Sequence, residues 1–223
     1  MTRNLSLIIL LVLQVNAGFG QDTRIRTDFS EITGRRYSTE KSKIEGSPYL
    51  NKFFYNANIG ENFNNVFMRY NVYKDEFEFI NQKNDTLVLN KSDDYKNITF
   101  TGLKTTYNLI SYVEKKETKK GYFLLVHKKN NTILYKKQRI SFFAAKSAST
   151  PYGNDVPAKF VPTDDKYFIK FNEQEILELT TSKKAIIKLF PEKKTEIENY
   201  IKTNNLDLEK EKDLIRLIDF LAN

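Results

Sequence analysis

Alternation of apolar and polar residues with a period of two constrains this chain more than any other feature. VFMRYNVY at 66–73 and EFEFI at 76–80 alternate in this way, and short β-branched runs follow at 86–90 and 97–102. Successive side chains of a β-strand point to opposite faces, so this pattern is typical of half-buried strands. Polar residues separate the runs. We therefore predict strands joined by turns.

Three longer apolar runs continue the pattern at 105–114, 122–127 and 132–143. A spacing of roughly ten residues per strand favours an antiparallel meander over 44–143. YFLLV, at 122–126, is apolar on both faces, which places it in the middle of the sheet.

The last third of the chain changes from strand to helix periodicity. KYFIKFN at 166–172 and EILELT at 175–180 predict a hairpin, and Ser182 can cap a helix that Pro191 ends. A second helix is expected over 193–203. Asp207 can cap a third, whose apolar positions are Leu214, Ile215, Leu217, Ile218 and Leu221. The predicted fold class is α+β: a long antiparallel meander, open or partly closed, followed by about three short helices, with 164–223 packed on the same domain as 44–143.

Between these parts, residues 144–163 hold three of the five prolines, Pro151, Pro157 and Pro162. Loops of this length are uncommon in compact domains and are often functional. We predict a long loop here. It is either a plain connection around the sheet or a lid or partner-contacting segment.

The first twenty residues have the pattern of a cleaved secretory signal. Arg3 precedes the apolar run 5–15, and small residues follow at Ala17, Gly18 and Gly20. A run of about eleven residues is too short for the roughly 20 that span a bilayer. We expect cleavage between Gly20 and Gln21, or after Ala17, and a periplasmic or secreted mature chain. An uncleaved anchor or a buried N-terminal helix is the alternative. A polar arm is predicted over 21–43.

Composition excludes several classes of chemistry. The chain has no cysteine, which rules out disulfides, thiolate metal sites and cysteine nucleophiles. Its single histidine, His127, ends an apolar strand, where a structural role is more usual than catalysis. HExxH, GxSxG, P-loop and GxGxxG motifs are missing from the sequence. We therefore assign no catalytic residue, cofactor or metal.

One group of carboxylates suggests an enzyme. Asp75, Glu76 and Glu78 lie near Arg69, and Glu76 and Glu78 share one face of a predicted strand. Paired carboxylates can cleave glycosidic bonds. Alternatively they are simply solvated on a wet face, with Arg69 pairing with an acid across the sheet.

Basic residues outnumber acidic ones by 36 to 28, and nine of them cluster around two predicted hairpins. Adjacent turns of a meander lie at opposite ends of a sheet, so these residues need not form one patch. With Tyr112, Tyr122 and Tyr135 interleaved, they could hold an anionic glycan or lipid. Nucleic acid is an improbable partner for an exported protein. Alternatively, the lysines only protect edges and turns against aggregation. The nine are Lys115, Lys116, Lys119, Lys120, Lys128, Lys129, Lys136, Lys137 and Arg139.

Several segments together resemble a group of uncharacterised exported proteins of the Bacteroidota. They are GSPYLN at 46–51, MRYNVYKDEFEF at 68–79, PAKF at 157–160, EKEKDLIRLIDFL at 209–221 and the Gly-Phe-Gly-Gln junction at 18–21. The resemblance implies export and a β-rich fold, and carries no activity. We expect a non-enzymatic binding or structural component of the cell envelope, with an envelope protein, anionic glycan or lipid as partner. The alternatives are a glycan hydrolase and a lipid carrier. The sequence leaves the oligomeric state open.

Overall fold

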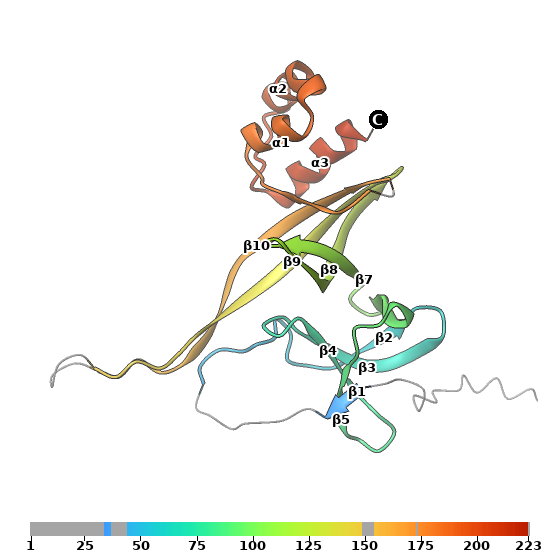
Figure 1. Cartoon of the computed structure of the whole chain (residues 1–223), viewed down its shortest axis with the longest axis vertical. Coiled ribbons are helices and arrows are strands. Elements are labelled where there is room, and N and C mark those ends of the chain that lie inside the picture. The colour runs from blue at the N-terminus through green and yellow to red at the C-terminus, as the bar shows by residue number, and fades with distance from the viewer. Residues whose placement is uncertain (1–33, 37–43, 149–153, 173, 223) are drawn as a thin grey trace, which may run out of the picture.

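The structure is a computed structural model that describes residues 34–36, 44–148, 154–172 and 174–222. Its strands form one 11-stranded sheet in the order β1-β5-β4-β3-β2-β6-β7-β8-β9-β10-β11, and helices follow at the C-terminal end (Figure 1). Every neighbouring pair of strands is antiparallel. The predicted α+β class, an antiparallel meander followed by helices, is confirmed.

The strands are β1 (Gly34–Arg36), β2 (Tyr55–Ile59), β3 (Phe63–Asn71), β4 (Glu76–Ile80), β5 (Thr86–Leu89), β6 (Asn97–Phe100), β7 (Thr105–Glu114), β8 (Glu117–Lys129), β9 (Thr132–Phe143), β10 (Lys159–Phe171) and β11 (Leu177–Leu179). The helices are the short 3-10 turns η2 (Asp93–Tyr95) and η3 (Pro191–Lys193), with α1 (Lys183–Leu189), α2 (Lys194–Thr203) and α3 (Glu211–Leu221).

The sheet departs from a simple meander at two places, the β1–β5 pair at its edge and the β2–β6 pair within it. β6 pairs with β2, with Ala57 opposite Phe100, and not with β5, which precedes it in the sequence. The connecting segment contains η2, whose Tyr95 ring lies 6.1 Å from that of Phe63 in the core. Burial of Tyr95 therefore directs the chain across the sheet to β2, a step that local alternation does not encode.

The first half of the sheet rolls around an aromatic core. Phe77 of β4 contacts Tyr107 of β7 at 5.3 Å and Tyr122 of β8 at 4.6 Å between ring centroids. Four strands separate β4 from β8 in the sheet, so these contacts require strong curvature. Phe77 is fully buried, and Phe79 is buried beside it. Each such side chain contributes about 2 kcal/mol of hydrophobic stabilisation. We call this part, β1 to β7, the roll.

The second half of the sheet is covered by the helices, as expected. Leu134 of β9, Ile169 of β10 and Leu179 of β11 share one buried cluster with Leu217 of α3. Figure 1 shows the helices packed at the end of β8–β11 that lies away from the roll.

Two predicted helix caps have different outcomes. Ser182 caps α1 as predicted, since its hydroxyl accepts from the backbone N–H of Ala185 at 3.3 Å. Asp207 does not cap α3, which has Lys210 at its N-cap position. The Asp207 carboxylate accepts from the Glu209 N–H at 3.2 Å, inside a turn that precedes the helix.

The predicted long loop 144–163 is largely the end of a β-hairpin. β10 already begins at Lys159, opposite Phe143, and an isolated bridge joins Lys146 to Val156. Pro162 is tolerated within β10 because β11 pairs only with Tyr167–Ile169 and leaves the earlier part of β10 at an edge. The hairpin projects far from the body (Figure 1). We call residues 139–148 and 154–163 the β9–β10 arm.

The predicted signal segment 1–20 lies outside the described residues, as does most of the predicted polar arm 21–43. Within that arm, Gly34–Arg36 forms β1 and pairs with β5, which corrects the prediction at this point. In the described part of the chain, no helix is long and apolar enough to cross a membrane.

Candidate functional site

Glu78, the most central of the predicted carboxylates, is a buried structural anion. Its side chain is fully buried and bonds the Arg69 guanidinium at 2.7 and 2.8 Å. The Tyr49 hydroxyl and the Asn71 amide donate to it at 3.0 and 3.1 Å. Arg69 faces Glu78 across the β3–β4 pair, so the predicted cross-sheet ion pair is confirmed. The alternative of a solvated Glu78 is wrong, because the segment carrying Tyr49 covers it.

Asp75 forms a second anion centre in the turn between β3 and β4. Its carboxylate pairs with Lys137 of β9 at 2.6 Å and with Lys91 at 2.8 Å. It also accepts from the Tyr70 hydroxyl and, at 3.1 Å, from the backbone N–H of Tyr122. Burial raises the pKa of Tyr70 well above its ordinary value, and the Asp75 charge raises it further. Burial lowers the pKa of Lys137, whereas Asp75 opposes that change.

This centre joins the roll to β8 and β9 where those two strands diverge. Their pairing ends at Leu124 and Lys136. Beyond it, the backbone N–H of Tyr122 donates to Asp75, and the Lys137 ammonium donates to the Tyr122 carbonyl at 3.0 Å. Tyr122 pairs with β7 but not with β9, and the side chains of Asp75 and Lys137 bond its backbone in place of β9. Gly121 makes room for them, since a Cβ there would lie 2.8 Å from Lys137 Nζ and 2.9 Å from Asp75 Oδ2.

These contacts argue against the hydrolase reading. A general acid or base must reach a substrate proton, and the lone pairs of Asp75 and Glu78 are engaged by protein donors. Glu76 is partly exposed but has neither of these carboxylates available as a second catalytic group. The structure therefore gives no catalytic pair among the three predicted acids.

His127 has a structural contact. Its Nε2 lies 2.7 Å from Asp219 Oδ1, and the neighbouring Lys129 ammonium donates to the Asp219 carbonyl at 3.1 Å. Both contacts tie β8 to α3, which agrees with the structural interpretation of this residue.

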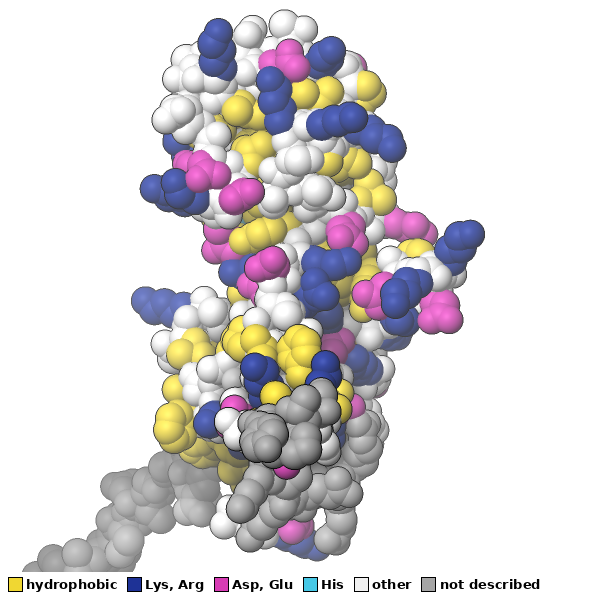
Figure 2. All heavy atoms as spheres, turned by 90° about the vertical axis from the view of Figure 1, so that its left-hand side faces the viewer, with side chains coloured by type: hydrophobic (Ala, Val, Ile, Leu, Met, Phe, Trp, Pro, Cys, Tyr) yellow, Lys and Arg dark blue, Asp and Glu magenta, His cyan; other side chains and the backbone are white. Residues whose placement is uncertain are grey.

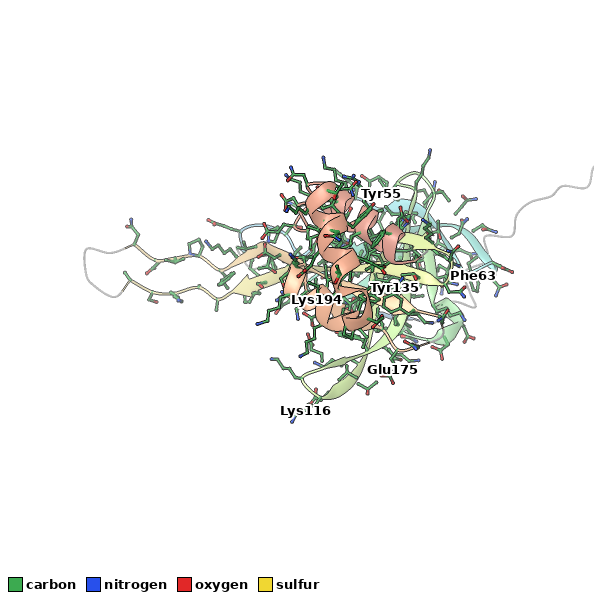
Figure 3. The ribbon with its side chains drawn as sticks, turned by 90° about the horizontal axis from the view of Figure 1, so that it is seen from above. Tyr55, Phe63, Lys116, Tyr135, Glu175 and Lys194 are labelled. Carbon is green, nitrogen blue, oxygen red and sulfur yellow. The ribbon has the colours of Figure 1, made fainter. Side chains whose placement is uncertain are left out.

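The predicted basic cluster is dispersed. Only Lys115 and Lys116 form the β7–β8 turn, with φ of 51° and 68°, whereas Lys119 and Lys120 lie within β8. Figure 3 shows Lys116 at a hairpin tip well apart from the β9–β10 arm. Many of these lysines are matched by acids. The pairs are Lys119–Glu114 at 3.1 Å, Lys120–Asp93 at 2.8 Å and Lys136–Glu211 at 2.6 Å.

Two of the three predicted tyrosine platforms are unavailable to a ligand. Tyr122 and Tyr135 are buried, with 1% and 5% of their surface exposed. Tyr112 remains partly exposed, and partial burial raises its pKa to about 12.

The β9–β10 arm has the opposite character. Of the twenty residues of the arm, four are charged: Arg139 at its base, Lys146, Asp155 and Lys159. Phe142, Phe143 and Val156 expose 38%, 49% and 48% of their surface. Figure 2 views the molecule from the side on which the arm projects and shows apolar side chains gathered beside Lys and Arg side chains. Exposed apolar side chains on a projecting hairpin make it a candidate for contact with another molecule.

A groove of about 210 Å³ runs beside the base of the arm. Consecutive β9 residues, 137–141, form one wall. Tyr112 of β7, Phe168 of β10 and Tyr73 of the β3–β4 turn supply aromatic surface. We call it the β9 groove. Sequence reasoning missed it, because it arises from the divergence of β8 and β9.

A smaller apolar crevice of about 80 Å³ opens into the roll between Tyr55, Tyr70, Phe100 and Tyr107. Exposed Leu50, Phe53 and Leu103 line it as well. A water needs about 10–15 Å³, so the crevice has room for one apolar side chain or a few waters.

Within the described ranges, no group of three or more His, Asp or Glu side chains is placed to hold a metal ion. Comparison with known proteins gives no family model, curated protein or solved structure that matches the chain.

Proposed function

We propose that this chain is an exported, non-catalytic binding component of the cell envelope, and that its β9–β10 arm contacts a partner protein. The observation that carries the proposal is the exposure of Phe142, Phe143 and Val156 on a projecting hairpin with few charges. Neighbouring residues of a strand point to opposite faces, so Phe142 and Phe143 expose apolar surface on both faces of the hairpin.

The other candidate functions receive less support. Asp75 and Glu78 are engaged in ion pairs, which weakens the case for glycoside hydrolysis by paired carboxylates. A lipid carrier needs an apolar cavity, whereas the interior of the roll is filled by side chains such as Phe77, Phe79 and Met68. Export is supported by the apolar run at 5–15 and the small residues that follow it.

Photo-crosslinking in the native envelope tests this function. A photoreactive phenylalanine analogue at Phe143 should form an adduct with one envelope protein. The same analogue at Val113, which is 60% exposed on β7, serves as the matched control and should not. Equal adducts at both positions, or none at Phe143, would contradict the proposal.

Export is tested on the same material. N-terminal sequencing of the purified protein should begin at Gln21, and a chain that still begins at Met1 in the cytoplasm would contradict this part of the proposal.

A further inference from the structure

The edge of β9 in the arm has no strand beside it. From Lys137 to Phe143, β9 pairs with β10 on one side, and its pairing with β8 on the other side has already ended at Lys136. Among the described strands none takes the place of β8 there. Unpaired strand edges are templates for a further strand.

The register shows which backbone groups point toward the groove. The N–H of Phe160 donates to the Glu45 carbonyl, away from β9, at 2.9 Å. Phe142 lies opposite Phe160, and in an antiparallel pair both members of such a position point outward. The N–H and C=O of Phe142 therefore face away from β10, and so do those of Ile140, two residues earlier.

The outer edges of β9 and β10 differ in whether their backbone groups are already bonded. On β10, Glu45 bonds both the Phe160 N–H and the Ala158 carbonyl, and Pro162 has no N–H to offer. The outer edge of β10 is thus closed to a further strand. The outer edge of β9 has no proline from Lys137 to Phe143, and within the described part of the chain no backbone segment bonds it there, so it is the open one.

Of the charged side chains that line the groove, only Arg139 has no ion pair with a described residue, although Asp165 nearby interacts with its charge. Asp75 is paired with Lys137, Glu114 with Lys119, and Lys166 with Glu178. The Arg139 guanidinium has a single long contact, 3.4 Å to the Asp164 carbonyl, while Asp165 accepts from the Arg139 backbone N–H on the β10 side. A carboxylate lying along the β9 edge would meet Arg139 as its strongest donor.

We propose that the β9 groove binds an extended, acidic segment of a partner protein as an additional strand beside β9. This mode of recognition combines backbone hydrogen bonds with pockets for alternate side chains. Tyr73 and Tyr112, whose rings are at least partly exposed, supply those pockets. A bilayer suits the edge less well, because lipid offers no partners for the N–H and C=O groups of Ile140 and Phe142. The inference rests on the proposed function, since it states how the partner of the arm is recognised.

The test uses defined peptides of about seven residues, the length of an ordinary strand. One alternates valine and glutamate, a second alternates valine and lysine, and a third is the glutamate peptide with alternate amides N-methylated. Amide NMR spectra of the full mature protein should change at Ile140 and Phe142 with the first peptide. The lysine peptide should bind at least about tenfold more weakly, and the N-methylated peptide should lose binding through missing hydrogen bonds.

A charge variant provides the matched control. Arg139→Glu should reverse the preference toward the lysine peptide. Lys128→Glu makes an equal change of charge at an exposed position on another strand, β8, and should leave the preference for the glutamate peptide unaltered. Unchanged Ile140 and Phe142 signals, equal binding of the first two peptides, or changes at the arm only with anionic phospholipid vesicles would each overturn the inference. If crosslinking at Phe143 still captures one protein in that case, the proposed function stands and only the mode of recognition is wrong. If crosslinking also fails, both are wrong.

Discussion

The two halves of the sheet bury their apolar faces in different ways. The roll encloses its own core, with rings from β4, β7 and β8 in mutual contact. The second half stays open and is covered by α1–α3 through Leu134, Ile169 and Leu179. A sheet needs a second layer over its apolar face, and here one half supplies that layer by curvature and the other by helices.

The curvature of the sheet changes at β8 and β9, between the two halves. β8 belongs to both halves: Tyr122 enters the core of the roll, and Phe123 packs with Tyr135 and Phe168 on the other side. β9 does not follow β8 into the roll. The two strands separate beyond the Leu124–Lys136 pair, so residues 117–123 of β8 and 137–143 of β9 are not paired with each other. The Asp75 centre closes part of the gap, and the β9 groove is the part that stays open.

Removal of the Asp75 charge should have the largest effect on this junction. Asp75→Asn leaves Lys137, whose side chain is 13% exposed, without its counter-charge. Breaking such a pair from one side costs about 3–4 kcal/mol. Urea unfolding followed by circular dichroism measures the loss.

A double variant separates charge from packing. Asp75→Asn with Lys137→Met should lose less stability than Asp75→Asn alone, because no unpaired ammonium remains. Asp93→Asn removes the same charge from an exposed carboxylate and should change little. If the double variant loses as much free energy of unfolding as the two single variants together, Asp75 does not stabilise the fold through Lys137.

A cavity under the helices should have the next largest effect. Leu217→Ala truncates a fully buried side chain of α3 and should cost about 3 kcal/mol. Hydrogen exchange should accelerate first in β9–β11 and the helices and later in β2–β4, since each half has its own core. Leu177→Ala, at a site that is 43% exposed, should stay within about 0.5 kcal/mol. Uniform acceleration would show that the halves unfold as one unit.

The smallest expected effect is a gain in stability at Asp165, beside the junction. Asp165 is exposed as a residue, but partial burial of its carboxyl raises the pKa above the ordinary value, while Lys136 opposes this change. The ionised form therefore costs stability at neutral pH, and the cost disappears when pH falls below the pKa of the unfolded chain, about 4, because both states are then protonated. Asp165→Asn should raise Tm slightly at pH 7 and leave it unchanged near pH 3. Asp164→Asn provides the matched charge change, and an equal rise in that variant would contradict the assignment.

Much of the fold could be predicted from local patterns. The runs at 76–80, 105–114 and 132–143 coincide with β4, β7 and β9. β8, which carries YFLLV, is an interior strand as predicted, but only Leu124 of that run is paired on both sides. Ser182 and Pro191 bound α1 because caps and prolines act within one helical turn. The β2–β6 pairing could not be predicted, since it depends on burial of Tyr95 beneath strands distant in sequence.

The candidate site was less accessible to sequence reasoning. Arg69–Glu78 could be anticipated from adjacent strands, whereas Asp75–Lys137 joins residues that only the roll brings together. The composition of 144–163 left open a plain connection or a contact segment, and the contact segment stays a prediction. Its three prolines suggested a loop, because nothing local reveals that this segment extends two long strands. Export, the partner and its recognition stay predictions.

The central physical claim is that the outer edge of β9 is open, and hydrogen exchange at single amides tests it most directly. In the isolated protein the Phe142 N–H should exchange fast, whereas the flanking Ser141 and Phe143 N–H groups, which face Val161 and Lys159 of β10, should exchange slowly. Equal protection of all three amides would mean that the edge is already paired and would contradict the account.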